Sequence, residues 1–222
     1  MLEARPSALG TRHSAGPIDR PRKVLRQRIL EAARSPSAGE WRSVGVITPG
    51  AYIGLALKVF YRMLLLLIRH AQAAQRDDGQ FPDDSIRPLV PKGRKTQGRM
   101  SRRLRRLGLV PTSILSSPWK RAWQTAGILA RETGLGKKQR TQCPALATEP
   151  RLEAIAEAVG AHGPDDIVAL VGHEPWMSEL ASQLLSGSPT RLAIDFPKSG
   201  VLGIEAETVG AASGRLKFFL VP

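Results

Sequence analysis

Basic residues that could bind or attack phosphate occur at three places in this chain, each shortly after an apolar run. Arg69 and His70 follow the run MLLLLI at residues 63–68, and His173 follows IVALV with one glycine between. Arg121 comes soon after the shorter run ILSSP. Guanidinium groups bind phosphate oxygens through charge-assisted hydrogen bonds, and a neutral imidazole nitrogen can attack phosphorus. If the fold brings these four side chains together, they are suited to phosphoryl transfer.

The apolar runs are the elements that would have to position these groups. Short, wholly apolar runs are typical of strands buried on both faces of a parallel sheet. We therefore predict strands at residues 63–68, 113–116 and 167–171, and their carboxyl ends would share one edge of the sheet, where open α/β folds build ligand sites. A helix predicted over 119–133 would place Arg121 in or near its first turn, where free N–H groups and the helix dipole favour an anion.

The rest of the chain after residue 62 alternates in the same way. Residues 72–91 read as a polar loop. The apolar spacing predicts helices over 93–107, 151–159 and 176–185, and the final strands are expected at 200–206 and 216–221. The stripe Trp119, Trp123, Ala126 and Leu129 has helical spacing and favours a core face over a binding platform. The predicted architecture is a three-layer α/β/α sandwich, with a mostly parallel sheet and an antiparallel edge strand.

With these residues in place, the chain resembles the histidine phosphatase superfamily, whose fold is phosphoglycerate mutase-like, and in particular its small SixA-like phosphohistidine phosphatase branch. The resemblance runs from about residue 63 to the C-terminus in the order of the family's own motifs. The matching segments are residues 66–71, 87–89 with 92–93, 116–118 with Arg121, 124–126, 171–175 and 196–200.

The chemistry assigns roles to the four basic residues. His70 is expected to be the nucleophile, attacking phosphorus in line and leaving a phosphohistidine on the enzyme that water then hydrolyses. Arg69 and Arg121 would hold the phosphate oxygens. His173 would donate to the same oxygens, and we expect it to act best when protonated.

Further site residues are expected around these four. Ser116 is a candidate hydroxyl donor to the substrate, whereas Ser117 fits a helix cap better. Arg87 is a candidate phosphate ligand. Asp84 occupies the position where SixA-like proteins carry an aspartate and is our candidate general acid, with Asp83 as a neighbour that could substitute. No metal site and no cofactor are expected, since the four histidines have no metal-ligand spacing.

The expected substrate depends on a segment of larger family members for which this chain has little room. Larger members of the superfamily carry a glutamate on an inserted segment, and this chain has little space for one. An imidazole leaving group, with a reference pKa near ~6.5, departs without strong acid help, and an open site admits a protein surface. Phosphohistidine on a protein is therefore the first hypothesis. The alternatives are a small-molecule phosphomonoesterase of the same superfamily and a catalytically silent phosphate-binding module.

Ala71 stands where the superfamily usually has glycine. The SixA-like branch often has alanine at this position, so we interpret Ala71 as a marker of that subgroup. If the backbone at residue 71 needed a positive φ, alanine would be strained there.

Charge divides the chain at residue 62. Residues 1–62 hold 11 Lys and Arg against 4 Asp and Glu, and residues 63–222 hold 22 against 15, so each part carries a net charge of +7. Residues 1–62 read as a basic, poorly ordered extension in which only 20–34 could form a helix. This extension could be a transit peptide or a segment that binds a membrane surface or nucleic acid through its charge. It could also be sequence upstream of a native start at Met63, and we favour this third interpretation.

The remaining composition gives broad expectations. Cys143 is the only cysteine, which excludes an intramolecular disulfide and favours a reducing, cytoplasmic location. Residues 44–68 are apolar, but Lys58 and Arg62 interrupt them, so no membrane span is expected. For residues 63–222 we expect a phosphorylated protein or a small phosphate ester as partner, and no nucleic acid. The oligomeric state stays open.

Overall fold

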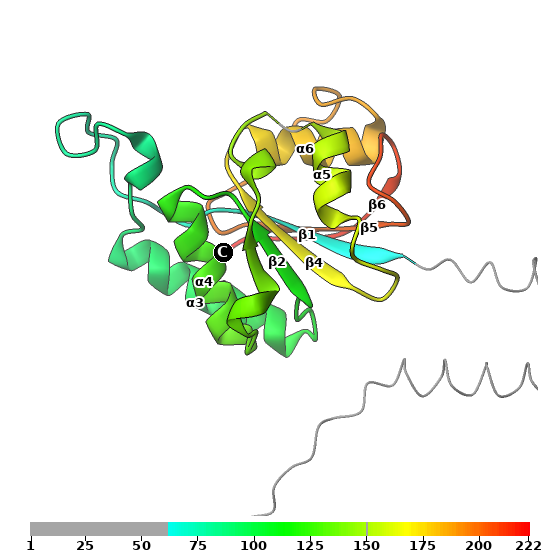
Figure 1. Cartoon of the computed structure of the whole chain (residues 1–222), viewed down its shortest axis with the longest axis horizontal. Helices are drawn as coiled ribbons and strands as arrows, with labels where there is room; N and C mark the ends of the chain where they lie inside the picture. Colours follow the sequence, from blue (N-terminus) through cyan, green and yellow to red (C-terminus); the bar gives the residue numbers. More distant parts are fainter. Residues whose placement is uncertain (1–61, 150) are drawn as a thin grey trace, which may run out of the picture. The chain divides into compact units, whose positions relative to one another are not determined.

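The computed structural model describes residues 62–149 and 151–222, and these form a six-stranded sheet with helices on both faces (Figure 1). The sheet order is β3-β2-β4-β1-β5-β6. The strands are β1 (Met63–Arg69), β2 (Ser113–Ser116), β3 (Arg140–Gln142), β4 (Ile167–Gly172), β5 (Val201–Ala206) and β6 (Gly214–Leu220). The helices are α3 (Pro91–Arg106), α4 (Lys120–Thr133), α5 (Leu152–Val159) and α6 (Trp176–Ser186).

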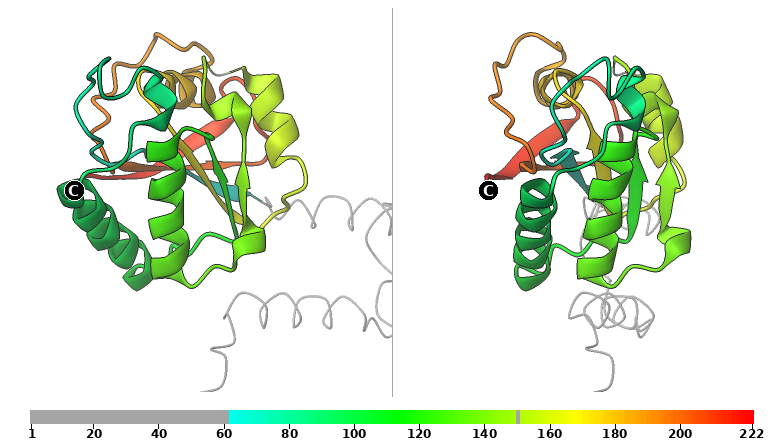
Figure 2. Two further views of the ribbon diagram at one scale, coloured as in Figure 1. Left: turned by 60° about the vertical axis from the view of Figure 1, so that its left-hand side comes forward. Right: turned by 90° about the vertical axis from the view of Figure 1, so that its left-hand side faces the viewer.

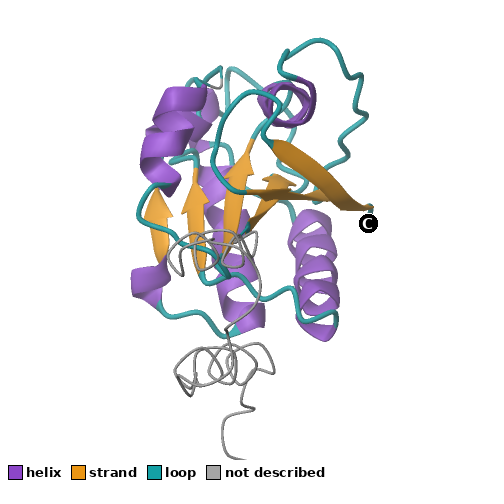
Figure 3. Cartoon of the chain, turned by 90° about the vertical axis from the view of Figure 1, so that its right-hand side faces the viewer, coloured by secondary structure: helices purple, strands orange, loops and turns teal. Residues whose placement is uncertain are grey.

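Pairing in the sheet is parallel on one side and antiparallel on the other. The strands β3, β2, β4 and β1 pair in parallel, so their arrows point the same way in Figure 3. The strand β5 runs antiparallel to β1, and β6 runs antiparallel to β5 at the edge. The mostly parallel sheet with an antiparallel edge is therefore confirmed.

The strand β1 explains why the central strands lack an alternating pattern. Leu65 and Leu67 face a core shared with α5 and α6, whereas Leu66 and Ile68 face a core shared with α3 and α4. Figures 1 and 2 show these two helix pairs on opposite sides of the sheet. The four residues 65–68 are buried between the two cores, so all four are apolar. The predicted three-layer sandwich is confirmed.

Element boundaries differ from the prediction in ways that have physical reasons. The helix α3 begins at Pro91, two residues before the predicted start, because proline is well suited to the first helical turn. The strand β3 was not predicted, since it has only three residues and two of them are exposed. The expected core stripe is only half right. Ala126 and Leu129 are buried, but Trp119 and Trp123 are partly exposed.

The predictions for the N-terminal part lie outside the described residues. This holds for residues 1–61 of the basic extension predicted over 1–62, and for the helix at 20–34. In the described part of the chain, no helix combines the length and the apolar character that crossing a membrane would require.

Candidate active site

The ends of β1 and β4 bring two histidines together at the carboxyl edge of the sheet. Arg69 is in register with Gly172, and the next backbone N–H, that of His70, donates to the Gly172 carbonyl at 3.0 Å. His70 and His173 therefore leave neighbouring strands side by side, with ring centroids 5.0 Å apart. The sheet register alone produces this predicted pairing.

The His70 ring is held in one tautomer. Its Nδ1 lies 2.7 Å from the carbonyl oxygen of Ala71. Because a carbonyl oxygen only accepts hydrogen bonds, Nδ1 must carry the proton, and Nε2 keeps its lone pair. The Nε–H of Arg121 donates to that Nε2 at 3.2 Å. Burial, aided by the charges of Arg121 and Arg69, lowers the pKa of His70 to about 3, so the imidazole is neutral at physiological pH.

His173 has a different environment. Its Nε2 lies 2.8 Å from the hydroxyl of Ser117, whereas its buried Nδ1 has no hydrogen-bond partner in the described structure. Burial, followed by the charges of His70 and Arg121, lowers the pKa of His173 to about 2. The free site therefore contains a neutral His173, which offers a phosphate one N–H. Our expectation of a protonated His173 does not describe this state.

Arg121 connects the two catalytic strands to the loop before α3. While its Nε contacts His70, its Nη1 donates to the Asp84 carbonyl at 2.7 Å and its Nη2 pairs with the Asp84 carboxylate at 2.8 Å. Arg87 pairs with the same carboxylate at 2.8 Å and donates to the Ala74 carbonyl. Asp84 thus holds two arginines at the site, Arg87 from its own loop and Arg121 from α4.

The charge state of Asp84 differs from what a general acid needs. Burial raises its pKa, but the hydrogen bond from Arg87 and the charges of Arg121 and Arg87 outweigh burial, and the net pKa is lowered. The carboxylate is therefore ionised at neutral pH and has no proton to give. Asp83 accepts only from Ser85 and does not join this cluster.

A turn after the long final loop fastens the end of β1. Arg69 donates to the Phe196 carbonyl at 2.6 Å, and the N–H of Ser199 donates to the carbonyls of Arg69 and His70 at 3.2 and 3.4 Å. Ser199 has a positive φ of 64°, a conformation that costs free energy for a non-glycine residue. The turn places Lys198 near the site, where burial and then the charges of Arg69, Arg87 and Arg121 lower its pKa.

Lys198 was missed by the sequence analysis as a site residue. The segment 196–200 was recognised, but nothing in the sequence indicates that its lysine lies near three arginines. The side chains of Arg69, Arg87, Arg121 and Lys198 bring four positive charges to the site, and Asp84 supplies the negative charge that pairs with two of them. Such a site favours a dianion.

Two residues of α4 support the backbone around the site. The Thr125 hydroxyl accepts the N–H of Ala71 at 3.0 Å and donates to the Arg121 carbonyl at 2.7 Å. Gln124 accepts the N–H of Leu89 at 2.8 Å. Ala71 is fully buried and does not have a positive φ, so alanine is unstrained at this position.

The two serines differ from their expected roles. The buried Ser116 hydroxyl donates to the Ser117 carbonyl at 3.0 Å, so in this state it has no donor left for a phosphate. The hydroxyl beside His173 is that of Ser117, which also accepts the N–H of Trp119 at 3.3 Å. Ser117 therefore replaces Ser116 as the serine nearest the phosphate site. The expectation for Ser116 is corrected.

Glu174 belongs to the helix that follows the site. Its carboxylate accepts the backbone N–H of Ser178 at 3.1 Å and the Ser178 hydroxyl at 2.8 Å, so it satisfies a free N–H in the first turn of α6. Glu174 therefore has a structural role at the start of α6.

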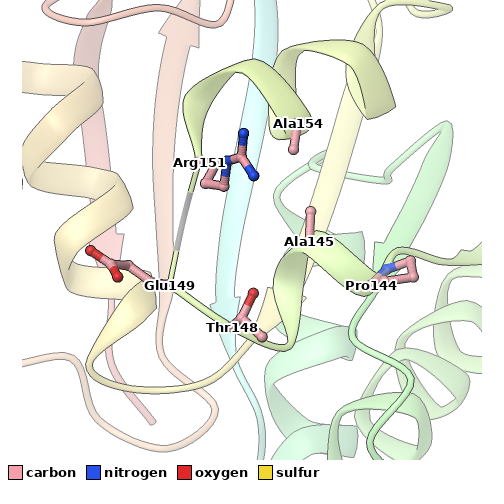
Figure 4. A pocket seen from close by; sticks show the side chains of 6 residues that line it. All are labelled: Pro144, Ala145, Thr148, Glu149, Arg151 and Ala154. Carbon is pink, nitrogen blue, oxygen red and sulfur yellow. The ribbon is translucent and has the colours of Figure 1, made fainter.

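A hollow elsewhere on the domain has a different lining. It lies beside α5 and is formed by Pro144, Ala145, Thr148, Glu149, Arg151 and Ala154 (Figure 4). None of the residues expected to bind phosphate lines it. Among residues 62–149 and 151–222, no group of three or more His, Cys, Asp or Glu side chains is arranged to hold a metal ion.

Comparison with known proteins agrees with this geometry. A family model described as histidine phosphatase superfamily (branch 1) matches residues 65–147. An uncharacterized protein of Picosynechococcus sp. (strain PCC 7002) is 36% identical over 152 residues, which cover 65% of this chain and 86% of that protein. The chain belongs to the histidine phosphatase superfamily.

Solved structures of the superfamily share the fold. The protein histidine phosphatase SixA complexed with tungstate matches with a TM-score of 0.60 and 20% identity, over 72% of this chain and 97% of SixA. The mycobacterial glucosyl-3-phosphoglycerate phosphatase complexed with VO3 matches with a TM-score of 0.53 and 18% identity, over 72% and 99%. At these identities the similarity is one of fold, and the two superfamily members are named for different substrates.

Proposed function

We propose that this chain is a SixA-like, metal-independent phosphatase that removes phosphate from protein phosphohistidine through a covalent phosphohistidine at His70. One observation carries the proposal. The ring of His70 is buried, neutral and fixed with its proton on Nδ1, which leaves the Nε2 lone pair 3.2 Å from the Nε of Arg121. An imidazole prepared in this way is a nucleophile and not a cationic phosphate ligand.

The first step forms a bond from Nε2 to phosphorus. The lone pair of His70 Nε2 attacks in line on a substrate whose imidazole is protonated on its other nitrogen. The bond between phosphorus and the substrate's imidazole breaks with its electron pair staying on nitrogen, so neutral imidazole leaves. The Nδ1 proton stays hydrogen-bonded to the Ala71 carbonyl, which can stabilise the positive charge that develops on the His70 ring. We assign Arg69, Arg121 and His173 to binding the oxygens of the transferred group.

The second step returns the enzyme to its starting state. Water attacks phosphorus, the bond to Nε2 breaks, and the electron pair returns to Nε2 as inorganic phosphate leaves. One proton of the water passes to the phosphate or to solvent. In both steps the protein mainly positions groups and stabilises charge, as is usual for phosphoryl transfer.

Asp84 fits this scheme better as an ionised clamp than as an acid. Its lowered pKa removes the proton that an acid would donate, and its carboxylate holds Arg121 and Arg87 in place. A phosphohistidine substrate does not need the acid, because a neutral imidazole leaves readily. Phosphate esters of aliphatic alcohols do need one, so the state of Asp84 favours a P–N substrate over an ester.

The experiment compares substrates on the full chain. We expect a phosphorylated histidine-phosphotransfer protein to be hydrolysed with a higher kcat/KM than sugar phosphates, without added metal and in the presence of a chelator. A clear preference for sugar phosphates would replace the proposal by the small-molecule phosphomonoesterase, which the likeness to the glucosyl-3-phosphoglycerate phosphatase fold keeps as second candidate. No turnover on either class would favour the silent module.

A further inference from the structure

Two tryptophans from different elements meet beside the active site. Trp119 directly precedes α4, and Trp176 is the first residue of α6. Their ring centroids lie 6.3 Å apart at an interplanar angle of 73°, and both side chains are partly exposed. The residues assigned to phosphate binding are charged or polar, and this pair adds aromatic surface next to them.

This tryptophan rim, Trp119 and Trp176, is close to the attacking atom. The guanidinium of Arg121, whose Nε contacts Nε2 of His70, has its Cζ 4.6 Å from the centre of the Trp119 ring. The ring of His173 lies 4.7 Å from Trp119 and 6.2 Å from Trp176, between centroids. The rim therefore shares two direct neighbours, Arg121 and His173, with the site of phosphoryl transfer.

The two indoles differ in which groups already contact their ring faces. Trp119 has a cation over its ring and the imidazole of His173 close by, so it positions Arg121 and His173. Trp176 meets its neighbours edge to face, at 73° to Trp119 and 86° to His173. No described ring is stacked in parallel on Trp176. Its indole is thus the one that can receive a flat group from a ligand.

We propose that the tryptophan rim is a subsite for the leaving group, and that the ligand it selects is a flat, protonatable ring, the imidazole of phosphohistidine. The inference rests on the proposed function and names what recognises its substrate. A phosphorylated imidazole that is protonated on its other nitrogen is cationic, and a cation is attracted to an indole face. That protonated form leaves as neutral imidazole when the P–N bond breaks, so the rim favours the reactive state without an acidic side chain.

The test uses two P–N compounds that differ in the ring. Phosphoimidazole has imidazole as its leaving group, whereas phosphoramidate has ammonia. We expect Trp176→Leu to lower kcat/KM for phosphoimidazole about tenfold more than for phosphoramidate. Trp176→Phe keeps an aromatic face and should restore most of the preference.

Trp123→Leu is the matched control. Trp123 lies on α4 with the Arg140 guanidinium 4.0 Å from its ring centre, so it makes the same kind of cation–π contact without any ring contact to His173. We expect Trp123→Leu to leave the ratio of the two kcat/KM values unchanged. An equal loss on both compounds in Trp176→Leu, or no rescue by Trp176→Phe, would show a structural role and overturn the subsite.

The two proposals fail in different ways. If the wild-type protein hydrolyses both compounds with the same preference as Trp176→Leu, the subsite is wrong and the proposed function stands. If the wild-type protein hydrolyses neither compound but does hydrolyse sugar phosphates, the proposed function is wrong and the subsite for an imidazole falls with it. A loss confined to phosphoimidazole supports both.

Discussion

The ends of β1 and β4 occupy equivalent places in the sheet, yet they present their histidines in different ways. Both histidines follow buried parallel strands, and burial holds both neutral. His70 bonds to a carbonyl of its own segment through Nδ1, and its free lone pair is on Nε2. His173 bonds to the distant Ser117 through Nε2, and its Nδ1 is unpartnered among the described residues. Similar positions therefore support different chemistry, because the hydrogen bonds differ.

The two strand ends also differ in what fixes them. The segment after β1 is held from two directions, by Thr125 of α4 and by the turn that contains Ser199. The segment after β4 runs directly into α6, with Glu174 bonded to Ser178 in the first turn. We infer that a nucleophile needs the tighter fixation, since misplacement of a reacting atom costs much more than misplacement of a group that donates to an oxygen.

Removal of His70 should give the largest effect. We expect His70→Ala to lower kcat at least about 10⁴-fold, because the atom that forms the covalent bond is lost. Steady-state hydrolysis of phosphoimidazole measures this. His162→Ala is the matched control, since His162 bonds to the Val159 carbonyl at the end of α5 and should leave activity unchanged. Substantial turnover by His70→Ala would remove the distinction between the two histidines.

Removal of His173 should cost less. We expect His173→Ala to lower kcat about 10²- to 10³-fold, which is typical for the loss of one donor to a developing oxyanion. The variant should still form the phosphoenzyme, more slowly. If His173→Ala abolished the phosphoenzyme and His70→Ala did not, the roles of the two strand ends would be reversed.

Asp84→Asn tests whether the loop carboxylate is a clamp or an acid. The substitution would keep the shape of the side chain but remove the charge that pairs with Arg121 and Arg87, and we expect KM to rise about tenfold. A clamp leaves the dependence of kcat on the leaving-group pKa unchanged across a series of aryl phosphates, whereas loss of an acid steepens it. Asp83→Asn, which removes the neighbouring exposed carboxylate, should alter neither quantity.

The pH dependence of stability tests whether both strand ends hold their histidines neutral. Both histidines titrate near pH 6.5 in the unfolded chain but at about 3 and about 2 in the folded protein. Between pH 6.5 and about 3, the unfolded chain binds protons that the folded protein does not. The free energy of unfolding therefore falls as pH falls, by roughly 1.4 kcal/mol per pH unit for each histidine.

Chemical denaturation of variants between pH 7 and pH 4.5 measures this slope. Carboxylates also contribute to the pH slope of the free energy of unfolding, so the difference in slope between variants is the informative quantity. His70→Ala and His173→Ala should each flatten the slope. A wild-type slope that neither buried histidine affects would mean that these rings are not held neutral.

The fold and the two strand ends were predictable because they depend on local patterns. Apolar runs indicate β1, β2 and β4, and the residues that follow such runs in parallel strands must share an edge. The strand β3 has no such pattern, since Thr141 and Gln142 are exposed and its pairing with β2 decides its state. Trp119 shows the limit of periodicity, because helical spacing cannot distinguish a core position from the rim of a site.

The site was less predictable where roles depend on contacts between distant residues. The lowered pKa of Asp84 follows from the hydrogen bond of Arg87 and from the charge of Arg121, which lies 37 positions later in the chain. Of the two adjacent serines, Ser117 has its hydroxyl beside His173, and a motif does not show which of two neighbouring hydroxyls points that way. Lys198 enters the site only because the turn around Ser199 is bonded to the end of β1.

Trapping of the phosphoenzyme tests the central claim most directly. Wild-type protein mixed with labelled phosphoimidazole is quenched in alkali, where phosphohistidine survives, and digested with trypsin. Cleavage after Arg69 gives a peptide of residues 70–76 in which His70 is the only histidine, and His173 falls in a separate peptide of residues 152–191. We predict acid-labile label on His70 and none in His70→Ala. Label on His173, or no label while turnover continues, would contradict the account.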